Sequence, residues 1–343
     1  MTSFRFRHAI FGATLTAAAL SAQAVTIALP TFSALYVFGD SLSDSGNNNL
    51  RLGGNTGPAP VSGTFIPSLP YAASPVGAYR PTYSNGPTWV TSFAAGLGLS
   101  AFSAPSLAGG GNYAYGGARM TVDGTGAPPF VPPPFPASVQ TQLNSYLSTR
   151  PVSSTALYVI AGGGNDVRAV GEAVAANPAN AVALTTAGAT AFATAAAQMV
   201  GTLRAGGASN IVVWNTPDVG KSPAAGSGVG ASAAAASFIA GAFNGALSQA
   251  LAGSGAIVFD VYGLIGSVVA SPASFGMTNV TQACGFVGNG CNAATALFWD
   301  GIHPTAYAQT IVASAMLTAV PEPSSMLMLA VGICALLAWR RRA

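Results

Sequence analysis

Charged side chains are the scarcest class of residue in this chain. Of its 343 residues only 6% are Asp, Glu, Lys or Arg, whereas 50% are hydrophobic. Intrinsic disorder requires the opposite balance, so a disordered acidic or basic protein is excluded. The formal net charge of +3 comes from arginines at the two ends, because the body between Val25 and Thr318 has seven basic and eight acidic residues. Such a body has no basic stripe for phosphates, which argues against nucleic acid as a partner.

Neither end of the chain carries the ~20 consecutive apolar residues that cross a bilayer comfortably. Residues 1–24 combine a basic start, an apolar run from Ala9 to Leu20, and the sequence Ala22-Gln23-Ala24. This order is typical of a secretory signal peptide, and we expect cleavage after Ala24. The alternative is a membrane anchor, for which the run is short.

The C-terminal segment, 320–343, contains Pro321-Glu322-Pro323, an apolar stretch from Met326 to Trp339, and three arginines. As a transmembrane helix the stretch would measure only ~21 Å, which suits a transient stop better than a permanent span. The three parts resemble the PEP-CTERM sorting signal of Gram-negative bacteria, which implies processing by an exosortase. The alternative is a retained tail anchor. Both predict export across the inner membrane. The sorting signal further predicts anchoring by this helix before processing and a periplasmic, cell-surface or matrix location afterwards.

The chain has only three cysteines, and Cys334 lies in the C-terminal segment. In an oxidising compartment, the remaining pair, Cys284 and Cys291, separated by a Gly-rich loop, predicts a disulfide. A metal site would require further ligands nearby, and the surrounding sequence offers none. We therefore expect a Cys284–Cys291 disulfide and no metal.

The body, 25–319, alternates between strand-like and helix-like segments. Short continuous apolar runs predict strands buried on both faces at 34–38, 156–160, 211–214 and 256–259. Helices are predicted between and after them, at 180–203, after Gly230 and at 305–317. This alternation predicts one α/β domain with a mainly parallel sheet covered by helices on both faces.

Ligands of such sheets bind beyond the carboxyl ends of the strands, so functional residues are expected there. Two segments rich in Gly or Pro, 51–86 and 128–136, are expected to be loops, the second of them extended. Long ordered loops often line a site, although they are also found as mere insertions.

Histidine is nearly absent, and one of the two, His8, would leave with the signal peptide. His303 follows Asp300 by three residues, in a turn made tight by Gly301 and Pro304. Such a turn lets the carboxylate accept a hydrogen bond from Nδ1–H, which fixes the tautomer and stabilises the imidazolium during proton transfer. The alternative for any lone histidine is a structural role.

A nucleophile for that base is expected where the first strand ends. Ser41 lies there, within Gly39-Asp40-Ser41-Leu42-Ser43-Asp44-Ser45-Gly46-Asn47. The alternative is that Asp40 or Ser41 begins a helix, since both types cap helices. The two interpretations are compatible, because N–H groups at a helix N-terminus also hold an oxyanion.

Two Gly-rich turns offer further hydrogen-bond donors to this region. One, 112–118, exposes the Gly117 N–H, and the other, 162–166, carries the Asn165 amide. Each is alternatively only a turn.

Together these four segments resemble the SGNH (GDSL-type) hydrolase family, from Val37 to about Tyr307. The resemblance implies a three-layer α/β/α sandwich with a flavodoxin-like sheet and without metal or organic cofactor. It implies Ser41, Asp300 and His303 as catalytic residues, and Ser41, Gly117 and Asn165 as the oxyanion hole. Whether Gly116 or Gly117 supplies the oxyanion N–H stays open. The segment 215–223 also resembles a loop of the family that shapes the pocket, or is only a turn.

Other enzyme classes match less well. The α/β-hydrolase elbow requires G-x-S-x-G, whereas this chain has Ser43 in the position of the second glycine. The segment 109–114 fits a dinucleotide-binding pattern by letter but opens no evident helix.

The leading hypothesis is a secreted or envelope-associated serine esterase or lipase that forms an acyl-enzyme on Ser41. The alternative is a cell-surface or exopolysaccharide-associated protein that uses the fold for binding, although an intact Ser41, Asp300 and His303 argue against it. Short acyl esters, lipids and acetylated polysaccharide all suit such a site.

Overall fold

The computed structural model describes residues 32–72, 79–126, 131–225, 227 and 231–320. The predicted signal peptide and nearly all of the predicted sorting tail, including the apolar stretch 326–339, lie outside these residues. In the part that is described, no helix is both long and apolar enough to span a bilayer.

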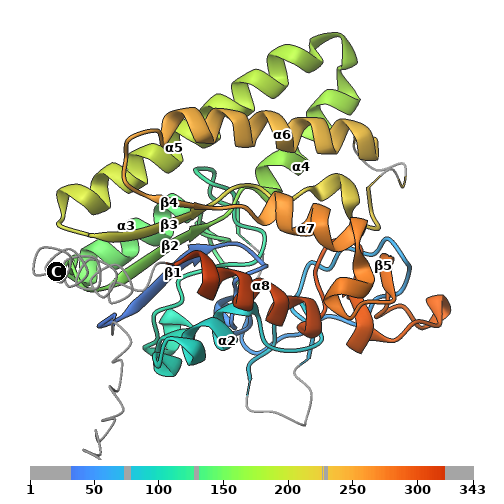
Figure 1. Cartoon of the computed structure of the whole chain (residues 1–343), viewed down its shortest axis with the longest axis horizontal. Helices are drawn as coiled ribbons and strands as arrows, with labels where there is room; N and C mark the ends of the chain where they lie inside the picture. Colours follow the sequence, from blue (N-terminus) through green and yellow to red (C-terminus); the bar gives the residue numbers. More distant parts are fainter. Residues whose placement is uncertain (1–31, 73–78, 127–130, 226, 228–230, 321–343) are drawn as a thin grey trace, which may run out of the picture. The chain divides into compact units, whose positions relative to one another are not determined.

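A parallel sheet of four strands lies at the centre of the described region (Figure 1). Its spatial order follows the chain: β1 (Leu35–Gly39), β2 (Leu157–Ala161), β3 (Asn210–Trp214) and β4 (Ile257–Phe259). In the register, Phe38 lies opposite Ile160, which lies opposite Val213. The four predicted strands are confirmed, with ends that differ by at most one residue.

A short extended segment continues the sheet beyond β1. The Tyr113 N–H donates to the Val37 carbonyl at 2.8 Å, and the Val37 N–H donates to the Gly111 carbonyl at 3.0 Å. This segment follows β1 in the chain but lies at the edge of the sheet, outside β1. If the five extended segments are numbered in chain order, their spatial order is 2-1-3-4-5, which is that of flavodoxin-like sheets. The predicted fold class is thereby confirmed, and the reversal of strand order places the ligand crevice beside the carboxyl end of β1.

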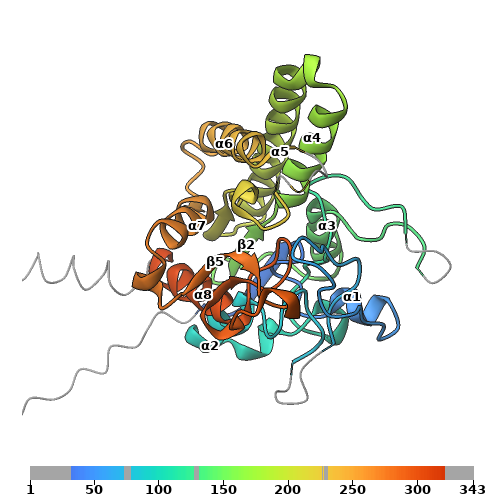
Figure 2. The same ribbon diagram turned by 90° about the vertical axis from the view of Figure 1, so that its right-hand side faces the viewer.

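Side chains of the strands alternate between two hydrophobic clusters, as expected for a sheet covered on both faces. On β1, Tyr36 and Phe38 join one cluster, whereas Leu35 and Val37 join the other. Helices cover both faces and give three layers (Figures 1 and 2). The first face packs against α3 (Val139–Thr149), α4 (Gly164–Ala176), α5 (Ala181–Ala205) and α6 (Ala233–Ala250). The second packs against α2 (Trp89–Gly96), α7 (Val261–Ala270) and α8 (Ala306–Ala319).

The three predicted helices correspond to α5, α6 and α8. In α6 the residues spaced by four, Ile239, Phe243 and Leu247, are buried in the first cluster. Its start is fixed by Ser232, whose Oγ accepts from the Ala235 N–H at 3.2 Å. Periodicity therefore identified both the helix and its buried face.

The chain between α7 and α8 adds a small sheet of β5 (Asn279–Ala283) and β6 (Ala296–Phe298). Cys284, directly after β5, forms the predicted disulfide with Cys291, with the two Cα atoms 5.2 Å apart. The Cys284 N–H donates to the Phe298 carbonyl at 3.0 Å, which attaches this loop to the strand that leads into Asp300. Within the described residues, no group of three or more His, Cys, Asp or Glu side chains is arranged to hold a metal ion.

Candidate active site

β1 ends in a tight turn that presents Ser41. A glycine is needed at position 39, because a Cβ there would lie 2.4 Å from the Ala161 carbonyl oxygen. The buried Gln142 side chain accepts from the Gly39 N–H at 2.8 Å and donates to the Gly39 carbonyl at 2.9 Å. These contacts fix the backbone two residues before Ser41, whose exposed fraction is 8%.

Neither Asp40 nor Ser41 begins a helix, so the alternative interpretation of this segment does not hold. The next helix, α1 (Asn47–Arg51), starts six residues later. Asp44 accepts hydrogen bonds at its start, from the N–H groups of Gly46 at 2.8 Å and Asn47 at 2.7 Å. Ser41 therefore lies in the turn between β1 and α1, and the Asp44 side chain accepts hydrogen bonds at the start of α1.

The turn after β6 brings His303 to Ser41 across 262 residues of sequence. The distance from His303 Nε2 to Ser41 Oγ is 2.8 Å, and the distance from His303 Nδ1 to Asp300 Oδ2 is 2.7 Å. Asp300 Oδ1 accepts from the backbone N–H groups of Ile302 at 2.8 Å and His303 at 2.7 Å. Asp300 is fully buried and His303 is 3% exposed, so the pair is shielded from water.

Gly116 and Gly117 differ in what their N–H groups contact. The Gly116 N–H donates to Asp44 Oδ2 at 3.0 Å and is therefore occupied. Gly117 has a φ of +82°, which favours glycine, and among the described residues no acceptor is bonded to its N–H. Asn165, in the first turn of α4, donates one amide hydrogen to the Ala118 carbonyl at 3.0 Å and keeps a second N–H.

Asp44 joins the Ser41 turn to the Gly116–Gly117 loop. In Asp44→Asn one acceptor oxygen becomes an NH₂ group, which cannot accept from the N–H groups of Asn48 and Gly116. Because each unsatisfied buried donor costs about 1–3 kcal/mol, we expect the free energy of unfolding to fall by at least ~2 kcal/mol in urea denaturation.

The matched control is Asp123→Asn, at an exposed carboxylate that accepts from the Ser138 N–H at 2.7 Å. It is expected to change the free energy of unfolding by less than ~0.5 kcal/mol. Equal decreases in the free energy of unfolding for the two substitutions would contradict the claim that Asp44 connects the Ser41 turn to the Gly116–Gly117 loop.

A second buried carboxyl, Asp40, lies beside Ser41. Burial raises the pKa of Asp40 to about 6, although the Leu42 N–H and the nearby His303 lower it. Asp40 Oδ1 accepts from that Leu42 N–H at 3.0 Å. The neighbour of Ser41 therefore changes its protonation state just below neutral pH.

Two tyrosines of the 51–86 loop lie against the Asp300–His303 pair, and sequence reasoning missed both. The Tyr71 hydroxyl donates to Asp300 Oδ2 at 2.8 Å. The ring centroid of Tyr83 lies 5.4 Å from that of His303, and its hydroxyl accepts from the Asn48 amide at 2.6 Å. A tyrosine in a Gly- and Pro-rich loop gives no local signal of a contact with a residue 229 positions away.

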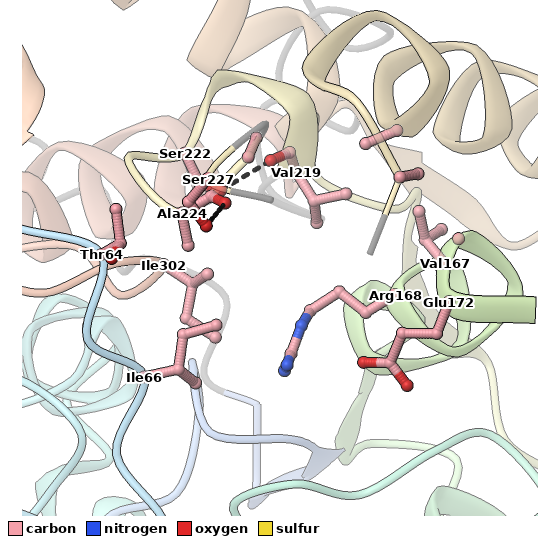
Figure 3. Close-up of a pocket in the computed structure, with 14 residues that line it drawn as sticks. Thr64, Ile66, Val167, Arg168, Glu172, Val219, Ser222, Ala224, Ser227 and Ile302 are labelled. Carbon is pink, nitrogen blue, oxygen red and sulfur yellow. Dashed lines mark hydrogen bonds between the residues drawn. The ribbon is translucent and has the colours of Figure 1, made fainter. Parts of the chain in front are cut away.

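A pocket of about 430 Å³ is lined by residues that neighbour the site in sequence, whereas Ser41, Gly117, Asn165 and His303 themselves do not line it (Figure 3). Ile302, the residue before His303, lies with Ile66 on one side, and Arg168 and Glu172 of α4 lie on the other. The volume falls within the ~300–1,000 Å³ of small-molecule sites. Val219 and Ser222 also line it, so the loop 215–223 does shape a pocket.

Two sequence profiles and two curated relatives match this chain. The sequence profile of the GDSL-like Lipase/Acylhydrolase family matches residues 35–316, and that of the PEP-CTERM protein-sorting motif matches residues 319–342. Two proteins named Esterase EstA, from Pseudomonas aeruginosa and Pseudomonas putida, are each 33% identical to this chain over 326 residues. These matches cover 82% of this chain and 46% of each relative, so the chain spans about half the length of these curated relatives.

Among solved structures, a lipase/acylhydrolase from Enterococcus faecalis aligns with a TM-score of 0.40 and 12% sequence identity, over 83% of this chain and 93% of that chain. The family profile spans both the segment with Ser41 and the segment with Asp300 and His303. The sorting motif indicates export and a surface or extracellular location. The chain therefore belongs to the GDSL-like lipase/acylhydrolase family, and it carries a PEP-CTERM sorting motif.

Proposed function

We propose that this chain is an exported serine esterase that hydrolyses carboxylic esters through an acyl-enzyme on Ser41. The observation that carries the proposal is the unbroken hydrogen-bonded series from Ser41 Oγ to His303 at 2.8 Å and from His303 to Asp300 at 2.7 Å. A protein that only binds its ligand needs no buried nucleophile, base and carboxylate in this order.

In the proposed first step, His303 Nε2 takes the Ser41 proton while Ser41 Oγ attacks the ester carbonyl carbon. The tetrahedral intermediate collapses when His303 transfers the proton taken from Ser41 to the leaving alkoxide. An alcohol departs, and the acyl group stays on Ser41. A water molecule then gives one proton to His303 and attacks the acyl carbon. His303 gives this proton to Ser41 Oγ as the second tetrahedral intermediate collapses, which releases the carboxylic acid and regenerates the Ser41 hydroxyl. Asp300 accepts the hydrogen bond from Nδ1–H throughout.

The negative oxygen of the tetrahedral intermediates would rest on N–H groups of Ser41, Gly117 and Asn165. Two observations support this set. The Gly116 N–H is engaged by Asp44, which favours Gly117 as the donor of that loop. The bond from Asn165 to the Ala118 carbonyl orients the amide next to Gly117. Donors held in place before the reaction stabilise the developing charge without reorganisation.

The pocket between Ile302 and α4 is proposed to hold the acyl group. Ile66 and Ile302 give it an apolar side next to His303, and burial of each methylene there would contribute ~0.8 kcal/mol. The proposal therefore favours esters with an acyl chain of several carbons over acetyl esters.

Ile302→Ala tests this assignment without removing the backbone N–H that Asp300 binds. We expect kcat/KM for p-nitrophenyl octanoate to fall about tenfold relative to p-nitrophenyl acetate, because contact with the longer chain is lost. The control is Val182→Ala, at a residue on α5 that is 78% exposed, and it should leave kcat/KM unchanged for both esters. Equal losses on both esters would exclude Ile302 from the acyl site.

We further propose that residues 1–24 are removed as a signal peptide, that 25–319 form the hydrolase domain, and that an exosortase processes the tail 320–343. The family match at 35–316 and the sorting-motif match at 319–342 support the domain and the tail, whereas the signal peptide rests on the sequence of residues 1–24 alone.

The direct test of the proposed function is hydrolysis of p-nitrophenyl esters by the purified full chain. Release of p-nitrophenol well above the buffer rate is expected, in proportion to protein concentration. A rate equal to that of buffer, from protein with a cooperative unfolding transition, would contradict the proposal.

A further inference from the structure

Asp300 receives a hydrogen bond from outside its own turn. The Tyr71 hydroxyl donates to Asp300 Oδ2 at 2.8 Å, and the same oxygen is bonded to His303 Nδ1 at 2.7 Å. Tyr71 is 4% exposed, so this bond is shielded from water. A buried hydrogen bond to a charged group is stronger than one between neutral groups, which makes this contact substantial.

The backbone and ring of Tyr71 are both fixed. The Tyr71 N–H donates to the Thr82 carbonyl at 2.7 Å. The Tyr71 ring packs edge-on against Trp299, the residue before Asp300, with ring centroids 6.0 Å apart at 90°. The hydroxyl is therefore held toward Asp300 by contacts on both sides of the site.

Tyr71 completes the shell of donors around the carboxylate. Asp300 accepts four hydrogen bonds: two at Oδ1 from the N–H groups of Ile302 and His303, and two at Oδ2 from the His303 ring and Tyr71. In the described part of the chain, no Arg or Lys forms an ion pair with Asp300. The hydroxyl of Tyr71 is thus the one donor of the four that comes from a distant segment.

The Tyr71 hydroxyl remains a donor at any pH at which the site works. Burial, followed by the negative charge of Asp300 and the bond to it, raises the pKa of Tyr71 far above its ordinary value. A permanent donor at Oδ2 draws negative charge away from the bond to His303. The carboxylate then stabilises the imidazolium less, and its orientation toward Nδ1 is restricted.

We propose that Tyr71 is a positioning residue of the reaction, which orients Asp300 and weakens the support that this carboxylate gives to the His303 imidazolium. The inference rests on the proposed function for its kinetic consequence, but the effect on the histidine is a property of the protein alone. Tyr71 touches no reacting atom in this scheme and acts only through the carboxylate.

Other titratable groups face His303 and bear on any pH profile. Asp40, with a pKa raised to about 6 by burial, interacts with His303 from the Ser41 turn. Tyr83 lies over the imidazole, and burial together with Asp44 raises its pKa well above the ordinary value. Neither Asp40 nor Tyr83 forms a hydrogen bond with the Tyr71 hydroxyl. A difference between the pH profiles of wild type and Tyr71→Phe therefore reports the contribution of the Tyr71 hydroxyl.

Tyr71→Phe keeps the ring packed on Trp299 and removes only the hydroxyl. We expect the acidic limb of the kcat/KM profile to move to higher pH by about 0.5–1 unit, as the loss of one hydrogen bond to a charged group implies. KM should be unchanged. The matched control is Tyr146→Phe, which removes another buried hydroxyl, bonded to the Pro151 carbonyl at 2.9 Å, and should leave the limb in place.

A second readout needs no substrate. In the full chain carrying His8→Asn, His303 is the single histidine, so its imidazole Cε1–H resonance can be titrated by NMR without ambiguity. The midpoint should rise in Tyr71→Phe by the same amount as the kinetic limb. An unchanged midpoint would overturn the role of Tyr71, even if Tyr71→Phe lowers activity equally at every pH. A shifted midpoint in a protein that hydrolyses no ester would instead refute the proposed function and leave the positioning role standing.

Discussion

Ser41→Ala is expected to lower kcat for p-nitrophenyl ester hydrolysis by a factor on the order of 10⁶, as loss of the nucleophilic serine does in subtilisin. The reason is chemical: no other atom in the described site accepts the acyl group, and His303 Nε2 then has no hydroxyl to deprotonate. Initial rates with p-nitrophenyl butyrate at several protein concentrations measure the effect.

The fold should survive this substitution, because Ser41 loses only its bond to His303 and leaves the turn around Gly39 intact. The control is Ser45→Ala, a serine of the same segment whose Oγ donates to the Ser103 carbonyl at 2.7 Å. It should retain most of the activity. Comparable losses from the two serines would show that damage to the turn, and not removal of the nucleophile, explains the effect.

Asn165→Ala is expected to reduce kcat by about 10²–10³, the usual consequence of removing one oxyanion donor. KM should change little, because the lost bond forms with the tetrahedral intermediate rather than with the bound ester. Steady-state kinetics on one ester separate the two parameters.

An asparagine at the opposite end of the sheet provides the comparison. Asn210 begins β3, and its amide also donates to backbone carbonyls, those of Ser154 at 3.1 Å and Ala156 at 3.3 Å. Asn210→Ala should therefore cost stability without a selective loss of kcat. A rise in KM with kcat preserved in Asn165→Ala would instead place Asn165 in ground-state binding.

The sheet and its main helices were predictable because their signals are local and periodic. The run from Leu35 to Phe38 is apolar on both faces, and both faces are buried. The spacing of Ile239, Phe243 and Leu247 likewise identified the face of α6 that packs on the sheet. The small sheet of β5 and β6 was missed, since its strands are short and Asn279–Ala283 is mostly polar, with only Ala283 buried.

The candidate site was predictable only where a motif carries it. Ser41, Asp300 and His303 each lie in a distinctive segment, and the structure brings the three side chains together. Composition did not decide against the alternative, a helix that begins at Asp40 or Ser41, because Asp44, three residues after Ser41, is an equally suitable residue to accept hydrogen bonds at the start of α1.

The other contacts between distant segments had no sequence signal. The choice between Gly116 and Gly117 depends on the bond from Gly116 to Asp44, which spans 72 positions. The bond from Tyr71 to Asp300 spans 229 positions and joins a loop to the end of β6. Such pairs are fixed by the packing of the whole domain, so only the folded chain reveals them.

The most direct test of the central claim is covalent labelling of the full chain with a fluorophosphonate, followed by peptide mapping. Reaction requires a serine hydroxyl activated by a base, and many serines in this chain offer unactivated competitors. The account predicts a single adduct on the peptide that contains Ser41, which disappears in His303→Gln. An adduct on another serine, or equal labelling of Ser41 after His303→Gln, would contradict it.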